Sequence, residues 1–123
     1  MTKTFITDKD GATIEASTAT VPSDRHFRNA WKLSGSVIAE DMTAAKVIFK
    51  DKIREVRKPL LEAQDVAYMK ALEDGDSSAQ TTAKNAKKAL RDAPAASAIT
   101  NADTVAKLKA AWDTSTLGDS PYA

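Results

Sequence analysis

The sequence predicts an α+β fold, in which short N-terminal β-hairpins are followed by a long helix and two shorter helices. Before residue 41, short segments rich in β-branched and aromatic residues flank two turns that contain glycine. After residue 41, apolar residues recur at helical spacing. We divide the chain into a hairpin region at 1–40, a helical region at 41–112 and an extended tail at 113–123.

The composition excludes several classes of protein. A chain of 123 residues fits one domain, and its formal net charge of +1 lacks the basic excess of nucleic-acid and membrane-surface proteins. There is no cysteine, so neither a disulfide framework nor thiolate chemistry is expected. No apolar run approaches the roughly 18 residues of a membrane span, and the N-terminus lacks a signal-peptide core. We therefore expect no nucleic-acid partner and no membrane partner.

Residues 4–7 and 12–16 read as the first hairpin. The intervening turn, at 8–11, ends in Asp10-Gly11, a pair that suits a backbone with positive φ. Asp8 and Asp10 are also spaced like the first calcium ligands of an EF-hand loop, but the later ligands are missing, so we predict a turn. A lone hairpin is marginal in water, so this one must pack on the rest of the chain or on a partner.

Residues 22–40 predict a short turn or helix and then a second hairpin. Ser23 or Asp24 can cap residues 25–30, and a turn around Gly35 joins residues 31–33 to residues 37–38. His26 is the only histidine, and Asp24 lies close to it in sequence. A general base is conceivable, but no motif supplies a nucleophile, so we expect a structural or surface histidine.

Residues 41–74 predict one long amphipathic helix, which Asp41 can cap, with Thr43 as the competing start. An apolar stripe follows spacings of four and three: Phe49, Ile53, Val56, Leu60, Ala63 and Ala67. Apolar residues occupy a second side after Pro59, which predicts two neighbours for that half. Pro59 itself predicts a kink or a break near residue 58. The first half is rich in Lys and Arg, which indicates either a solvated face or a basic patch that docks on an acidic partner.

Two shorter helices follow. Ser77 or Ser78 begins a helix that ends near residue 93, and the short connection predicts an antiparallel helical hairpin with the long helix. Pro94 stops it. Residues 95–100 are expected to connect to a last helix, capped by Thr100 or Asn101, that reaches residue 112.

The sequence contains no P-loop, dinucleotide-binding, zinc-protease or nucleophile-elbow motif, and its carboxylates form no evident acid–base pair. We therefore expect no enzyme, no cofactor and no metal site, and a function exerted through surfaces. Aromatic, aliphatic and arginine side chains are the candidate interface residues: Phe5, Ile6, Trp31, Arg54, Arg57, Trp112 and Tyr122.

Several segments carry a family resemblance. Arg54, Arg57, Leu61 and Asp65 form an Arg-x-x-Arg…Leu-x-x-x-Asp pattern, and residues 89–94 read Ala-Leu-Arg-Asp-Ala-Pro. Within residues 25–112, this order resembles small tail proteins of tailed bacteriophages. The helical part is similar to the C-terminal part of tail-fibre assembly proteins.

The resemblance implies a structural or fibre-associated protein of the phage tail. Its partners would be other tail or fibre proteins, in a homo-oligomer or a larger assembly, and its location the virion tail or the host cytoplasm during assembly. The alternative is a tail-fibre assembly chaperone that is not retained in the virion. Val66 stands where such chaperones carry a tryptophan, so we place the virion protein first.

Overall fold

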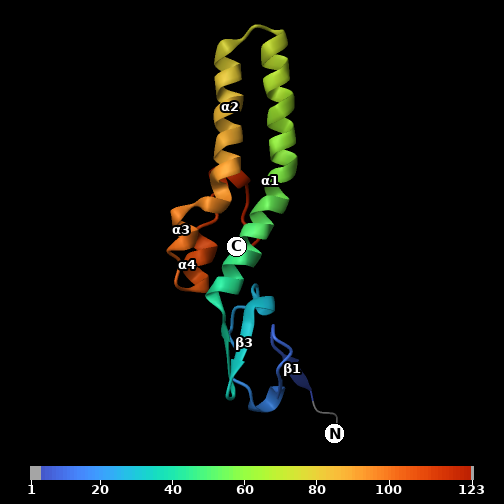
Figure 1. The fold of residues 1–123 in the computed structure, drawn as a ribbon, viewed down its shortest axis with the longest axis vertical. Helices are drawn as coiled ribbons and strands as arrows, with labels where there is room; N and C mark the ends of the chain where they lie inside the picture. The colour runs from blue at the N-terminus through green and yellow to red at the C-terminus, as the bar shows by residue number, and fades with distance from the viewer. Residues whose placement is uncertain (1–3, 123) are drawn as a thin grey trace.

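The computed structural model describes residues 4–122 and confirms the α+β fold. Two small antiparallel sheets come first, β1 (Phe5–Thr7) with β2 (Thr13–Glu15) and β3 (Trp31–Ser34) with β4 (Val37–Glu40). The helices are α1 (Met42–Glu73), α2 (Ser77–Asp92), α3 (Ser97–Thr100), α4 (Val105–Ala110) and α5 (Thr114–Leu117). Short 3-10 turns span Ala16–Thr18, Arg28–Ala30 and Ala93–Ala95. The molecule is elongated, with the sheets at one end and the α1–α2 hairpin projecting at the other (Figure 1).

Both predicted hairpins are present. In the first, Ile6 pairs with Ile14, and Gly11 takes a φ of 85° that its turn requires. In the second, Leu33 pairs with Ile38 across a turn that contains Gly35 at a φ of 63°. Trp31 and Ile38 point to the buried side of the second sheet.

Asp8 joins the two hairpins. Its Oδ1 accepts hydrogen bonds from the amides of Asp10, at 2.9 Å, and Ala12, at 2.8 Å, and its Oδ2 accepts one from the Leu33 amide on β3, at 2.8 Å. The Leu33 amide is the main reason why the pKa of this carboxyl is lowered. Lys9 continues the junction, because its amide donates to the Trp31 carbonyl at 2.9 Å. The first hairpin therefore packs on the rest of the chain.

The long helix is continuous through Pro59. Asp41 caps it as predicted, accepting from the Ala44 amide, and α1 runs unbroken to Glu73 although its ribbon changes direction in the lower half (Figure 1). At its end, the Asp76 amide donates to the Ala71 carbonyl and the Gly75 amide to that of Leu72, the pattern of a Schellman motif with Gly75 at positive φ. Pro59 has no backbone N–H to donate, so α1 lacks one hydrogen bond there, and α2 packs along α1 in this region.

The core lies beside the first half of α1. Ala45, Phe49 and Ile53 are fully buried there, packed with residues from the connector before β3 and from the C-terminal segment. The core also contains Phe27, Ile99, Leu108, Trp112 and Leu117. The predicted stripe is therefore core only as far as Ile53, because Val56 and Leu60 are partly buried and Ala63 and Ala67 are exposed.

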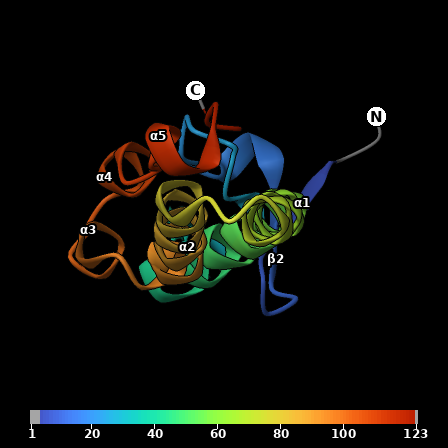
Figure 2. The same ribbon diagram turned by 90° about the horizontal axis from the view of Figure 1, so that it is seen from above.

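Two neighbours were predicted for the second half of α1. Among residues 4–122, α2 lies along it, and the short helix α5 contacts both α1 and α2. Seen from above, α2 lies beside it, and α5 lies on one side of the pair (Figure 2). We call residues 59–89 the helical arm. Within the arm only Ala71 and Ala83 are buried, whereas Val66, Met69 and Leu72 are about half exposed. Of the apolar residues on the predicted second side, Leu61 is partly buried, whereas residues 4–122 leave Val66, Met69 and Leu72 largely uncovered.

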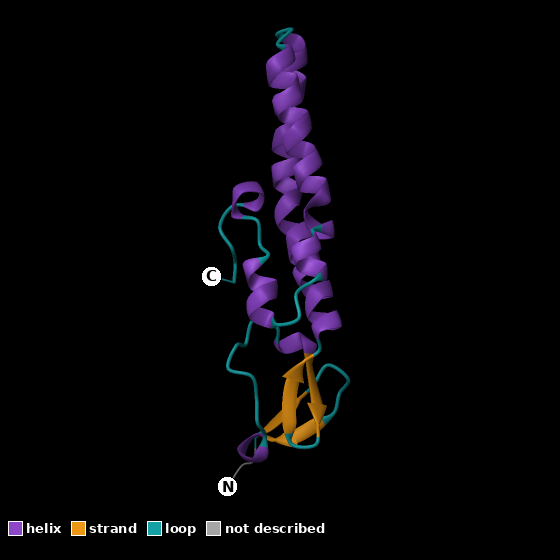
Figure 3. Cartoon of the chain, turned by 90° about the vertical axis from the view of Figure 1, so that its left-hand side faces the viewer, coloured by secondary structure: helices purple, strands orange, loops and turns teal. Residues whose placement is uncertain are grey.

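The C-terminal segment differs from the prediction. Thr104, rather than Thr100 or Asn101, caps the last predicted helix, which is shortened to α4, and α3 occupies part of the expected connector. Residues 113–122 of the expected tail contain α5, which Figure 3 shows as a short helix near the C-terminus. Leu117 and Tyr122 of this segment are buried in the core. Asp113 caps α5, and the Trp112 indole Nε1 donates to the Gly118 carbonyl at 3.0 Å, which turns the chain back.

Replacing a core aromatic residue should destabilise the fold far more than trimming the arm. Phe49→Ala is expected to lower the free energy of unfolding by about 3–5 kcal/mol, because the side chain is fully buried. Val66→Ala, in the exposed part of the arm, is expected to change it by less than about 0.5 kcal/mol. Chemical denaturation followed by circular dichroism measures both. Equal losses would contradict the placement of the core.

Candidate functional site

The seven candidate interface residues fall into two groups. Phe5 is 58% exposed on β1 and Ile6 is partly buried beside it. Arg54 is exposed and forms an ion pair with Asp51, at 2.9 Å. Arg57 is partly buried and its Nη1 donates to the carbonyls of Leu90, at 3.4 Å, and Arg91, at 3.0 Å. Phe5 and Arg54 therefore offer surface to a partner, while Arg57 also satisfies carbonyls at the end of α2.

The other three candidates are buried. Trp31 lies in the second sheet with the Arg25 guanidinium 5.7 Å from its ring centroid, and its indole Nε1 has no hydrogen-bond partner among the described residues. Trp112 and Tyr122 belong to the core. These three rings have little surface left for a partner, because the fold itself uses them.

Tyr122 lies at the centre of an aromatic cluster. Its ring stacks on Phe27, with centroids 5.0 Å apart, and on Phe49, at 5.5 Å. Trp112 meets it edge-on at 6.1 Å, and His26 at 5.6 Å. Burial raises the pKa of the Tyr122 phenol. The cluster anchors the C-terminal segment to α1 and to the connector before β3.

A charged cluster borders these rings. The Lys109 ammonium on α4 lies 2.6 Å from Asp24 Oδ2 and 3.2 Å from His26 Nδ1, which is itself 3.0 Å from Asp24 Oδ1. Asp24 also accepts from the His26 amide. Lys109 first, and then that amide, hold the pKa of Asp24 at about 2. Asp24 and His26 are close in sequence, but the sequence carried no signal for Lys109, which is distant in the chain.

The charged cluster acts as an ion-pair network that ties the connector to α4. It edges an open cavity of about 480 Å³ lined by polar residues: Ser23, Asp24, Arg25, His26 and Arg28. The Asp24 carboxylate already accepts hydrogen bonds from the Lys109 ammonium and the His26 amide. Among residues 4–122, no group of three or more His, Asp or Glu side chains is arranged to hold a metal ion. No helix in the same range is both long and apolar enough to cross a membrane.

The helical arm leaves apolar side chains exposed, including Val66, Met69 and Leu72. In addition, α2 carries Lys84 and Lys87 within the arm and Arg91 just beyond its base, at spacings of three and four, so these cations share one side of the helix. Lys87 reaches Asp65 on α1 at 2.6 Å and lies 5.8 Å from the ring centroid of Tyr68. The spacing was visible in the sequence, but these residues were not among the candidates, because their juxtaposition with Arg54 and Arg57 requires the helices to pair in this register.

Neutralising Asp24 should give a pH-dependent loss of stability. Its pKa is depressed from 3.8 to about 2 in the fold, so the carboxylate stabilises the fold above pH 3.8, and this contribution is lost as the pH falls through about 2. Asp24→Asn should therefore lower the free energy of unfolding by about 1–2 kcal/mol at pH 7 and by little at pH 2.

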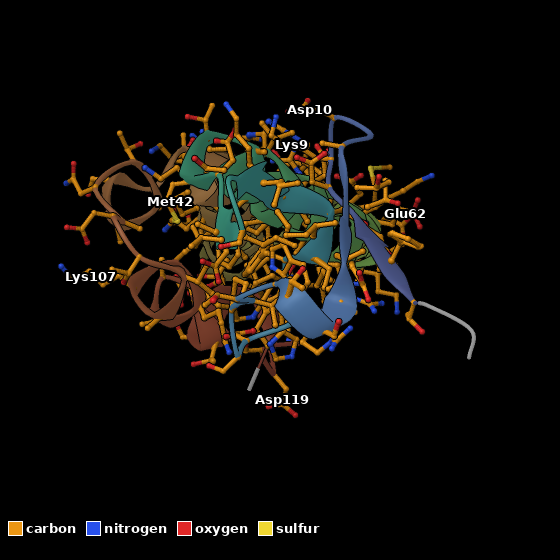
Figure 4. The ribbon with its side chains drawn as sticks, turned by 90° about the horizontal axis from the view of Figure 1, so that it is seen from below. Lys9, Asp10, Met42, Glu62, Lys107 and Asp119 are labelled. Carbon is orange, nitrogen blue, oxygen red and sulfur yellow. The ribbon has the colours of Figure 1, made fainter. Side chains whose placement is uncertain are left out.

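Urea denaturation across this pH range measures the effect. Asp119→Asn is the control, since Asp119 lies exposed at the edge of the molecule (Figure 4) and should change stability little at either pH. A loss from Asp24→Asn that stays the same from pH 7 to pH 2 would contradict the ion-pair network.

The chain was compared with protein-family models, with curated proteins and with solved structures, and none of the three comparisons gave a match.

Proposed function

We propose that this chain is a non-enzymatic structural or fibre-associated protein of a bacteriophage tail, acting through protein–protein surfaces. The observation that carries the proposal is the helical arm. It projects from the core and buries only two of its side chains, so most of its surface is free for other chains. A surface with half-exposed Val66, Met69 and Leu72 is better explained by assembly than by the stability of the isolated chain.

The phage context comes from the resemblance. Leu61 and Asp65 lie in the α1 part of the arm, and the Ala-Leu-Arg-Asp-Ala-Pro segment at 89–94 follows the base of its α2 part. Asp65 forms an ion pair with Lys87 across the two helices. The helical part of the resemblance to phage tail proteins thus lies on and next to one helical hairpin, which supports a role for the arm in contacts with tail or fibre proteins or with further copies of this chain.

The same arm would also serve a second candidate function, that of an assembly chaperone. An assembly chaperone for tail fibres would use the surface to hold a fibre and would leave before the particle is finished. It would be found in the host cytoplasm rather than in the virion.

Mass spectrometry of purified particles separates the two. A tail protein is expected in the particle at constant stoichiometry after gradient purification, together with known tail components. Absence from particles, combined with recovery on newly made fibres, would exclude the virion protein and leave the chaperone. Absence from both would contradict the phage proposal as a whole.

A charge on the apolar side of the arm should block incorporation. Val66→Asp is expected to reduce the amount of a tagged copy in particles by about tenfold, because an interface core does not accommodate an unpaired carboxylate. Val47→Asp is the matched control, since Val47 is 55% exposed and Val66 54%, but Val47 lies outside the arm on the first half of α1. Quantitative immunoblots of particles measure both variants. Equal incorporation of the two would show that the arm is not the contact surface.

A further inference from the structure

We propose that a basic groove along the helical arm and its base binds an acidic, extended segment of a partner polypeptide. The inference rests on the proposed function only in taking the partner to be a protein. We define the basic groove by six cations from α1 and α2 and one ring: Lys50, Arg54, Arg57, Lys84, Lys87, Arg91 and Tyr68.

The groove consists of two adjoining hollows. Tyr68, Lys84, Lys87 and Arg91 line a cavity of about 330 Å³ between the helices of the arm. Lys50, Arg54, Arg57 and Arg91 line a second of about 300 Å³ at its base, with Pro94 and Ala95. Because Arg91 lines both, the two hollows form one track on the same side of the helix pair.

Most of the positive charge in the groove is not neutralised within the chain. Asp51 pairs with Arg54, and Asp65 pairs with Lys87. The side chains of Lys50, Lys84 and Arg91 form no ion pair with any residue from 4 to 122, and Arg57 donates to carbonyl oxygens rather than to a carboxylate. Six of the chain's 18 Lys and Arg residues line this track. Such a track focuses a positive potential on its occupant.

The chemistry of the groove favours carboxylates. Arginine binds a carboxylate through two parallel hydrogen bonds, and three arginines line this track. A single-stranded nucleic acid would need several aromatic rings on which to stack its bases, but Tyr68 is the one aromatic residue that lines either hollow. Arg54 and Tyr68 are about four helical turns apart, or about 21 Å, which spans about six residues of extended peptide.

The test is fluorescence anisotropy with a labelled peptide of about eight residues in which Glu alternates with Ser. The intact protein should bind it, and binding should weaken as salt rises from about 0.1 M to about 1 M, where the Debye length falls from about 10 Å to about 3 Å. Lys84→Gln combined with Arg91→Gln removes two exposed, unpaired cations from the groove and should weaken binding about tenfold.

A control variant carries the same change in charge outside the groove. Lys32→Gln combined with Lys70→Gln removes two exposed lysines, one on β3 and one on α1, and should change the affinity by less than about twofold. Thermal melting of each variant establishes that it is folded. No binding by the intact protein, or equal loss in both double variants, would overturn the proposal.

An oligothymidylate of similar length is measured in parallel. Tighter binding of this strand than of the peptide, lost in the groove variant, would identify a nucleic-acid groove and would also overturn the proposal. The outcome is independent of the particle experiment. A protein that is absent from particles but binds the peptide through the groove would contradict only the tail-protein proposal, whereas one that is present in particles but does not bind the peptide would contradict only the groove.

Discussion

The stacking of the Tyr122 ring on both Phe27 and Phe49 is the contact on which the rest of the structure depends. Phe27 comes from the connector before β3, Phe49 from the first half of α1 and Tyr122 from the C-terminal segment, and Trp112 closes the group edge-on. Three regions distant in sequence therefore meet at one set of rings. Since aromatic side chains bury large apolar areas, this small group supplies much of the core of a chain with few aromatic residues.

This placement of the core leaves the arm anchored at its base. Two cations of α1 fasten neighbouring segments by donating to backbone carbonyls, Lys46 to Thr100 and Arg57 to Leu90 and Arg91. The sequence predicted a solvated face or a docking patch for the basic residues in the first half of α1, and these two residues instead fasten segments of the fold. Lys50, with Lys84 and Arg91 on α2, forms no ion pair with residues 4–122 and leaves positive charge at the surface.

Local signals predicted most of the elements, and contacts between distant residues account for what they missed. The cap at Asp41 and the two glycine turns each depend on a few adjacent residues, so the sequence identified them. The Tyr122 cluster and the Asp24–Lys109 pair have no periodic signature, because their partners lie in separate elements. The basic groove is predictable only in part. The spacing of the cations on each helix is visible in the sequence, but the register in which the two helices pair is not.

The arm also separates stability from recognition within one chain. Its helices meet mainly through small or partly buried residues, with Ala71 and Ala83 buried at the contact, so the arm buries little apolar area of its own. The tip around Gly75, farthest from the aromatic cluster, should open at a lower free energy than the base. A partner bound along the groove would contact both helices at once, and because it binds the paired form it would stabilise that form by mass action. The small apolar area buried between α1 and α2 in the arm adds little to the stability of the fold. For the same reason, a bound partner would change the stability of the helix pairing by a large fraction.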